Sequence, residues 1–269
     1  MKKRKTRQYR RYKQETEFPV KFVVIFAIIV LVIGGAVGYI WRIVTTSDYF
    51  KIRDVVVREQ GVVDFSYLKG RNIFDISLGS EIGDILERYP NYSQIKLVRI
   101  LPNRIYVDFI RRRPVAFVKL ASKFFAVDSK GVLFYIPARA EDSGLPLILG
   151  LENKASLFKL GKKNNIRELF FALYIIYELK SNKALHNYRI SRINVSSLRS
   201  SEFFISFADK EITVGDLQVK ISPENLKEKI NLLAGLVTQG RADLANVEYV
   251  DLRFKEAVIK LKDSKNVRR

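Results

Sequence analysis

Three consecutive arginines, Arg111, Arg112 and Arg113, precede Pro114 in the stretch LPNRIYVDFIRRRPVAFVK (residues 101–119). The whole chain has a formal net charge of +20 and a pI near 10. An arginine run in so basic a chain raises the question of nucleic-acid binding. The alternative is structural, because proline cannot donate a ladder hydrogen bond and charged residues discourage pairing at a sheet edge.

Residues that could carry catalysis are few. The only histidine is His186, and no GxSxG motif supplies a serine for it to activate. Cysteine is absent, as are the HExxH, GxxxxGK[ST] and GxGxxG motifs of zinc proteases and nucleotide-binding proteins. Carboxylate pairs such as Glu248 with Asp251 occur in any chain of this size. We expect no catalytic residue, metal or cofactor, and a membrane-anchored envelope hydrolase stays an alternative, because a Ser–Lys dyad or a carboxylate pair is still possible.

An uncharged run, FVVIFAIIVLVIGGAVGYIW (residues 22–41), decides where the rest of the chain lies. Twenty residues at about 1.5 Å each span about 30 Å, the thickness of the bilayer core. The run is longer than the apolar part of a signal peptide and ends in aromatic residues, so we expect an uncleaved transmembrane helix. The first 21 residues carry nine Lys or Arg against two Glu, which predicts a cytoplasmic basic tail that also binds membrane lipids.

This topology changes the meaning of the positive charge. The part after the span keeps 39 basic and 26 acidic residues, a net charge of about +13. On the far side of the cytoplasmic membrane, the acidic groups within reach are lipid headgroups and envelope polymers. We therefore expect no nucleic-acid partner, and no feature of the sequence points to a small-molecule substrate.

The segment after the span predicts the order strand, helix, helix, strand, strand. A β-branched strand in KIRDVVVRE leads to turn glycines and to a helical stretch near residues 81–89, which Pro90 ends. Two strands follow, joined at Pro102–Asn103. In the second, Ile105, Val107 and Phe109 share one face, which predicts a half-buried strand.

The remaining chain predicts a second mixture of strands and helices. A hairpin turns at residues 128–131, and a helix in NNIRELFFALYIIYELK has its apolar stripe at residues 166, 169, 170, 173, 176 and 177. Short strands are expected at 193–195, 203–207 and 211–214. A second helix should start at Ser222–Pro223 and run to residue 237, because serine caps a helix and proline suits its first turn. NVEYVDLRFKEAVIKLK predicts two final strands, and residues 263–269 a frayed tail.

Four stretches in this order after a single span resemble the bacterial cell-division protein family FtsQ/DivIB: FKIRDVVV, GRNIFDIS, VRILPNRIYVDFIRRRPVAFV with FFAVDSKGVLF, and VEYVDLRF. The resemblance covers nearly the whole chain and implies an α+β protein. Its predicted parts are a tail (1–21), a transmembrane helix (22–41), a juxtamembrane stretch with a POTRA domain of β-α-α-β-β order (42–118), a β-domain with a mixed or antiparallel sheet and packed helices (119–262), and a tail (263–269).

The resemblance also implies a function. It predicts a non-enzymatic scaffold of the division complex, enriched at the septum, that binds FtsB/DivIC and FtsL and links complex assembly to septal peptidoglycan synthesis. A POTRA-type protein-translocation or envelope-assembly component is the other alternative, although about 220 residues after the span leave no long series of alternating membrane strands for a barrel.

Partner binding in this family is understood as strand addition at a sheet edge, where free backbone groups supply affinity. By position after VDLR, Arg253 and Phe254 match partner-contacting positions. The following strand is the predicted pairing edge: Ala257, Val258, Ile259, Lys260 and Leu261. The alternative for Phe254 is a core or cross-strand role.

The run Arg111, Arg112, Arg113 and Pro114 matches the family's charged-residue-then-proline motif at the POTRA/β-domain junction. The family often has an acidic residue where this chain has Arg111, so a salt bridge of that kind is not expected here. Structural placement of the chain at the exit of the strand is the favoured interpretation.

Overall fold

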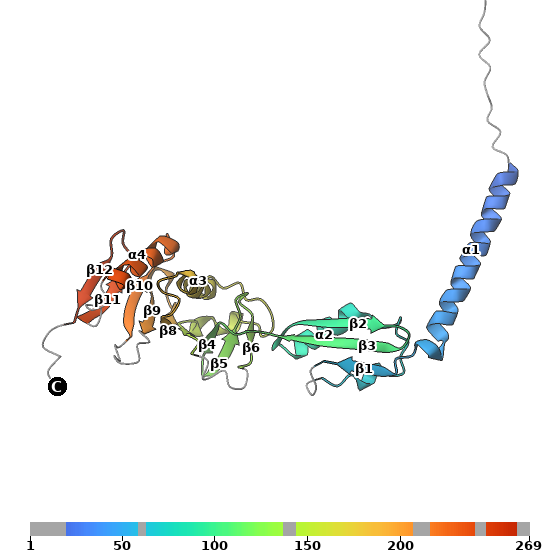
Figure 1. Ribbon diagram of the computed structural model, residues 1–269, viewed down its shortest axis with the longest axis horizontal. Coiled ribbons are helices and arrows are strands. Elements are labelled where there is room, and N and C mark those ends of the chain that lie inside the picture. Colours follow the sequence, from blue (N-terminus) through green and yellow to red (C-terminus); the bar gives the residue numbers. More distant parts are fainter. Residues whose placement is uncertain (1–19, 59–62, 137–143, 207–215, 240–245, 263–269) are drawn as a thin grey trace, which may run out of the picture. The chain divides into compact units, whose positions relative to one another are not determined.

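The computed structural model describes residues 20–58, 63–136, 144–206, 216–239 and 246–262 (Figure 1). Contacts between residues group the chain into two compact units. The first takes residues up to 56 together with 61–77 and 98–106, and the second takes 57–60, 78–97 and everything from 107 onward. Both are mixtures of helix and sheet, which confirms the predicted α+β class.

A single long helix, α1 (Val20–Thr46), begins the described chain. Within the described residues it is the one helix long and apolar enough to cross a membrane, with a mean hydropathy of 2.9. It extends past both ends of the predicted run at 22–41, and its side chains are exposed. This helix therefore fits a single-pass membrane protein.

The predicted strand, helix, helix, strand, strand order is found with one correction. The elements are η1 (Asp48–Phe50), β1 (Asp54–Val57), η2 (Ser66–Leu68), α2 (Leu78–Arg88), β2 (Tyr92–Ile100) and β3 (Arg104–Arg111). The first predicted helix is a single 3-10 turn, η2, because its few residues bury one apolar side chain, Leu68, and cannot extend into a full helix. The strands form a sheet in the order β1-β3-β2.

The predicted hairpin of β2 and β3 turns at Pro102–Asn103 as expected. Ile105, Val107 and Phe109 are buried, while their alternating neighbours are exposed or half-buried. The period-two pattern of β3 thus identified its buried face correctly.

A nine-stranded mixed sheet makes up most of the second unit, in the order β12-β11-β10-β9-β8-β7-β4-β5-β6. The strands are β4 (Ala116–Leu120), β5 (Lys123–Val127), β6 (Leu133–Phe134), β7 (Leu147–Leu149), β8 (Arg189–Asn194), β9 (Ser201–Ser206), β10 (Leu217–Ile221), β11 (Val247–Asp251) and β12 (Val258–Leu261). Three neighbouring pairs are parallel, β4 with β7, β7 with β8 and β10 with β11. The hairpin predicted around residues 128–131 joins β5 to β6.

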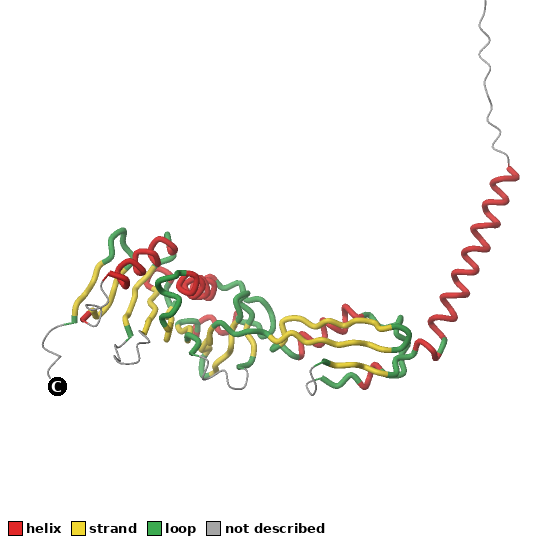
Figure 2. Tube along the Cα trace, viewed as in Figure 1, coloured by secondary structure: helices red, strands yellow, loops and turns green. Residues whose placement is uncertain are grey.

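Two helices, α3 (Arg167–Ser181) and α4 (Leu226–Gln239), pack on one face of this sheet and share its core (Figure 2). Two shorter turns complete the unit: η4 (Glu152–Leu157) lies between β7 and α3, and η5 (Leu198–Ser200) lies between β8 and β9. The predicted apolar stripe of α3 was partly wrong. Tyr177 is 65% exposed, whereas Phe171, Ile175 and Leu179 are buried. Apolar residues occur on most sides of α3, so periodicity alone did not identify the face that meets the sheet.

Three other expectations need comment. Helix α4 starts at Leu226 instead of Ser222–Pro223, since Asn225 has a positive φ of 49° that interrupts a helix. The strand expected at 211–214 lies outside the described residues, and β10 was not predicted. Strand β4 runs through the predicted domain boundary at 118/119, and the division into a POTRA domain and a β-domain stays a prediction.

Candidate partner-binding edge

Strand β12 is the last strand at one end of the nine-stranded sheet. It pairs on one side with β11 in an antiparallel register, with Ile259 opposite Val250 and Lys260 opposite Tyr249. No described strand lies on its other side. The predicted edge strand, Ala257–Leu261, is thus found at an edge of the sheet, starting at Val258.

The backbone of β12 offers hydrogen-bonding groups to that open side. The Lys262 N–H donates to the Asn246 carbonyl oxygen at 2.7 Å, so the groups of Lys262 point toward β11. Because the direction alternates along a strand, Lys260 and Val258 also point toward β11. The N–H and C=O groups of Ile259 and Leu261 therefore point away from the sheet, where an added strand would bind them.

The side chains of β12 are poorly covered on both faces. In register, Ile259 and Leu261 lie on the same face as Val250 and Val247, the face on which the buried core packs. Val247 and Val250 are buried, yet Ile259 is 43% exposed and Leu261 is 60% exposed. The apolar face of the sheet, which is buried as far as β11, therefore continues onto β12, where it is exposed. This exposed apolar surface is available to a partner.

Lys260 lies on the opposite face of β12. Its ammonium group contacts the Glu248 carboxylate at 2.9 Å and lies 5.7 Å from the centre of the Tyr249 ring. The ammonium group of Lys220, on β10, also lies over the Tyr249 ring, 3.8 Å from the ring centre. Lys260 thus contacts β11 through its side chain on this face.

Arg253, in the loop between β11 and β12, is bound to a buried carboxylate. Its Nη2 donates to Asp251 Oδ2 at 2.6 Å, its Nε donates to Oδ1 at 2.9 Å, and its backbone N–H donates to Oδ1 at 3.0 Å. The Arg253 Nη1 also reaches Ser200 Oγ at 3.4 Å. Arg253 therefore shapes the loop that leads into the edge strand, and its predicted contact with a partner stays a prediction.

The Asp251 carboxylate should make stability depend on acid pH. Its hydrogen bonds from the Arg253 side chain, together with those from the Arg253 backbone, hold the pKa of Asp251 below its usual value, against the effect of burial. A lowered folded pKa gives stability that is present above about pH 4 and is lost as pH falls through the folded pKa. We expect Asp251→Asn to lower the free energy of unfolding by about 1.5–3 kcal/mol at pH 7, and by progressively less below pH 4.

Urea unfolding of both proteins between pH 7 and pH 3 measures this dependence. Glu248→Gln is the control, because the Glu248–Lys260 pair is about half exposed and such pairs contribute at most about 1 kcal/mol. A difference between wild type and Asp251→Asn that stays constant to pH 3 would contradict the assignment.

Phe254 is 60% exposed in the same loop. The Arg253 guanidinium carbon lies over the Phe254 ring, 5.9 Å from its centre, in a cation–π contact. The alternative that Phe254 is a core residue is wrong, since a core residue would be buried. An exposed aromatic ring next to an open strand edge has the character of an interface residue.

The arginine run lies elsewhere in the second unit. Arg111 ends β3 and Pro114 precedes β4, whereas β12 is six strand spacings from β4 in the sheet order, about 29 Å. Arg111 and Arg113 are exposed, while Arg112 is turned inward. The structure therefore does not bring the two predicted groups of site residues together.

Arg112 is the buried member of the run, and all its donor nitrogens are bound inside the protein. Its Nη1 lies 2.6 Å from Asp128 Oδ2, its Nε donates to the Pro90 carbonyl at 3.1 Å, and its Nη2 donates to the Tyr92 carbonyl at 3.0 Å. Asp128 Oδ1 in turn accepts the N–H groups of Lys130 and Val132, both at 2.9 Å, in the β5–β6 turn. Arg112 thus ties the start of β2 to that turn.

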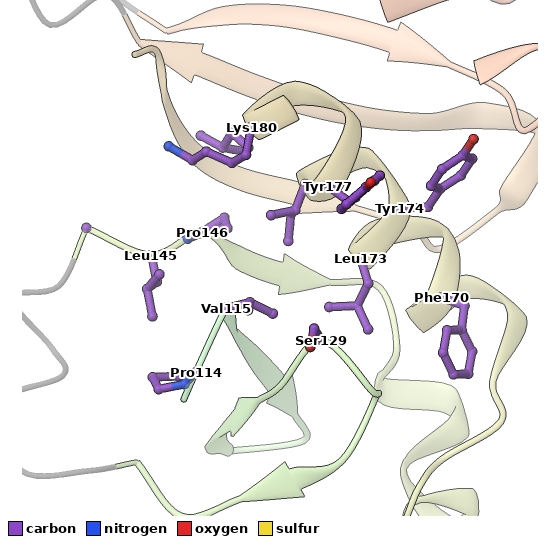
Figure 3. A pocket seen from close by; sticks show the side chains of 13 residues that line it. Pro114, Val115, Ser129, Leu145, Pro146, Phe170, Leu173, Tyr174, Tyr177 and Lys180 are labelled. Carbon is purple, nitrogen blue, oxygen red and sulfur yellow. The ribbon is translucent and has the colours of Figure 1, made fainter. Parts of the chain in front are cut away.

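Pro114 lines a groove of about 580 Å³ beneath α3 (Figure 3). The groove is mostly apolar, and Tyr174, Tyr177 and Lys180 project along its rim from α3, opposite Leu145 and Pro146. Sequence reasoning missed it because Tyr177 was placed on the buried stripe. The sign that could have revealed it was the pair of tyrosines, which carry polar hydroxyl groups suited to a rim.

Neither the histidine nor the acidic side chains of the described residues form a recognisable catalytic or metal-binding group, although Lys229 Nζ donates to Ser222 Oγ at 2.7 Å and forms a Ser–Lys contact. His186 is exposed, and its Nδ1 lies 2.8 Å from the Lys183 carbonyl oxygen. Among the described residues no three His, Asp or Glu side chains are placed to hold a metal ion. What the described surface offers is an open strand edge and exposed apolar side chains, which suit protein binding.

Comparison with known proteins identifies a family to which the chain is similar. The profile described as "Cell division protein FtsQ/DivIB, C-terminal" matches residues 116–253, just over half of the chain. "Cell division protein FtsQ" of Geotalea daltonii is 25% identical over 84% of this chain and 81% of its own length. The protein of the same name from Koribacter versatilis is 25% identical over 91% of this chain and 71% of its own. "Cell division protein DivIB" of Clostridium tetani is 22% identical over 74% of this chain and 72% of its own.

The profile match covers the strands from β4 to β11 and ends at Arg253, directly before Phe254 and β12. The relatives extend the similarity over most of the chain under one pair of names. The four stretches that suggested this relationship lie in the elements that build both units. The chain belongs to the cell-division protein FtsQ/DivIB family.

Proposed function

We propose that the chain is a non-enzymatic, single-pass scaffold of the division complex that binds FtsB/DivIC and FtsL on the exported side of the cytoplasmic membrane. Membership of the family supports a role in division. The single observation that carries the binding proposal is the open edge of β12, where the backbone groups of Ile259 and Leu261 point away from the sheet and their apolar side chains are exposed on one face.

Strand addition is the binding mode that this edge supports. A partner strand would pair with the outward N–H and C=O groups of Ile259 and Leu261, while its alternate side chains would contact the two faces of β12. One face presents Ile259 and Leu261, and the other presents Val258 beside the Lys260–Glu248 pair. Apolar partner side chains on the first face would complete the core that stops short of the edge.

The membrane span gives the proposal its place in the cell. With the basic tail in the cytoplasm, the chain after α1 lies on the exported side, where septal peptidoglycan is made. A scaffold anchored in this way links assembly of the membrane partners to septal synthesis by holding them at one place. The arginine run needs no acidic partner in this proposal, because Arg112 is bound internally.

Capture of FtsB/DivIC by the full-length chain tests the proposal, together with the position of a fluorescent fusion in dividing cells. We expect septal enrichment and capture by wild type, and a roughly thirty-fold or larger loss of capture for Phe254→Lys, because an exposed aromatic anchor is replaced by a charge.

Tyr177→Lys is the matched control, since Tyr177 is exposed to a similar degree but projects from α3 on the rim of the groove. Its capture of FtsB/DivIC should equal that of wild type. A fusion spread evenly along the membrane of dividing cells would refute the septal role, and unchanged capture by Phe254→Lys would remove Phe254 from the binding site.

A further inference from the structure

We propose that the first unit has a second interaction surface, which contacts anionic phospholipid headgroups where α1 leaves the membrane. This lipid-contact surface consists of Tyr49, Arg53, Lys69, Arg71 and Leu101, all of them exposed. It rests on the proposed span of α1 and is separate from the β12 edge. It would hold the first unit against the membrane.

The end of α1 fixes the depth of this surface. Charge-free sequence ends at Trp41, and α1 continues to Thr46. Val44 and Thr45 thus lie about 4.5–6 Å beyond the last residue of the span, which is within the headgroup layer. Groups that bind the carbonyl oxygens of Val44 and Thr45 are therefore held at headgroup level.

Asn72 makes that connection. Its Nδ2 donates to the carbonyl oxygens of Val44 and Thr45, both at 2.8 Å, and its Oδ1 accepts the Phe74 N–H at 2.9 Å. Asn72 is buried, and the last carbonyl groups of a helix have no partner within the helix itself. The loop that carries Lys69 and Arg71 is thereby attached to the membrane end of the unit.

Backbone hydrogen bonds extend this attachment to the turn between β2 and β3. The Ile52 N–H donates to the Arg71 carbonyl and the Arg53 N–H donates to the Asn103 carbonyl, both at 2.9 Å. Figure 1 shows the β2–β3 turn at the end of the sheet beside the last residues of α1. Leu101, at the tip of this turn, therefore also lies next to the membrane end of α1.

The exposed side chains there are of the kind that enters a membrane interface. Leu101 is 58% exposed, its neighbour Ile100 is 45% exposed, and Tyr49 is 60% exposed. Apolar tips enter the boundary between headgroups and acyl chains, and tyrosine favours the headgroup level. An apolar turn tip is costly in water, and contact with the bilayer removes that cost.

The charge of the unit favours anionic lipid. Beyond Trp41, its described residues carry seven Lys or Arg and four Asp, a net charge of +3. Two of the aspartates are paired, Asp48 with Lys51 at 2.7 Å and Asp54 with Arg104 at 3.7 Å. Arg53, Lys69 and Arg71 are three of these seven basic residues, and each basic residue near an anionic surface increases partitioning about five-fold.

The absence of cysteine from the sequence allows a clean test with single introduced cysteines. Full-length Leu101→Cys and Gln94→Cys would carry an environment-sensitive fluorophore in vesicles of phosphatidylcholine with or without phosphatidylglycerol. Gln94 is the control, because it is exposed on β2 seven residues from Leu101. We expect nitroxide-labelled lipid to quench the probe at 101 at least about five-fold more than at 94 with phosphatidylglycerol present, and much less without it.

Two further arms make the test specific. Lys69→Glu with Arg71→Glu should remove most of the quenching at 101, and so should Asn72→Asp, which keeps the acceptor for Phe74 N–H but loses the donor to the helix carbonyls. Equal quenching at 101 and 94, or quenching that ignores phosphatidylglycerol, would overturn the proposal. A probe at 101 that responds to soluble polyphosphate but not to phosphatidylglycerol would also overturn it and would indicate an anionic polymer.

Different results would overturn the proposed membrane span and the proposed lipid-contact surface. Release of the chain from vesicles by alkaline carbonate would overturn the membrane span and this inference with it. Retention of the chain with an unquenched probe at 101 would overturn the lipid-contact surface alone. Partner capture through β12 is measured separately and can succeed in either case.

Discussion

Replacement of Arg112 by Ala is expected to lower the free energy of unfolding of the second unit by about 3–5 kcal/mol. The Arg112 and Asp128 side chains are only 9% and 10% exposed, and their nearest oxygen and nitrogen are 2.6 Å apart. Removal of the guanidinium leaves the Asp128 charge buried without its partner. It also leaves the carbonyl oxygens of Pro90 and Tyr92 without their bonds from Arg112.

Arg113→Ala is the matched control, one residue along the same run. Arg113 is exposed, so its loss should change stability by less than about 0.5 kcal/mol. Urea unfolding followed by circular dichroism compares the two variants with wild type. Equal midpoints for Arg112→Ala and Arg113→Ala would show that Arg112 has no special structural role.

A milder pair of changes keeps the test informative if Arg112→Ala does not fold. Asp128→Asn keeps the Oδ1 acceptor that holds the β5–β6 turn and removes the charge. Arg112→Met keeps much of the side-chain volume. If the ion pair is the stabilising feature, the double variant should be less destabilised than the sum of the two single variants by about 1–3 kcal/mol.

The elements that could be predicted were those whose signal is local. The charge-free run gave α1, the alternation of Ile105, Val107 and Phe109 gave the buried face of β3, and Pro102–Asn103 gave its turn. In each case neighbouring residues decide the structure, because the repeat or the turn is completed within about ten residues.

The features that could not be predicted depend on contacts between distant residues. Arg112 is buried because Pro90, Tyr92 and Asp128, 16 to 22 residues away, supply its acceptors. The sequence marked the arginine run as unusual but did not distinguish Arg112 from its two exposed neighbours. The hydrogen bonds from Arg253 to Asp251 are local, yet they were not predicted either. The short stretch VDLRF is compatible both with a partner contact by Arg253 and with a local bond to Asp251.

The edge itself illustrates the same limit. The strand pattern and family resemblance together indicated residues 257–261, but which of its backbone groups point outward depends on the pairing with β11. The bond from Lys262 to Asn246 settles this direction. It also decides where a proline would test strand addition, because a proline at Val258 would remove an N–H that faces β11.

Ile259→Pro is therefore expected to weaken capture of FtsB/DivIC roughly 5- to 150-fold while leaving the fold intact. Proline at this position removes an N–H that points away from the sheet, and proline is tolerated in edge strands on that side. A partner carbonyl left without its donor costs about 1–3 kcal/mol, which corresponds to that loss of affinity. Titration of the full-length variant with the purified partner, in the same detergent as wild type, measures the change.

Two companion variants separate the backbone from the side chain. Ile259→Ala keeps the outward N–H and loses the apolar side chain, so it should weaken capture less than Ile259→Pro. Val258→Pro should lower the unfolding midpoint as well as capture, because the lost N–H faces β11. If Ile259→Pro captures the partner as well as wild type does, strand addition at β12 is wrong, and the exposed residues of this edge then bind by their side chains or not at all.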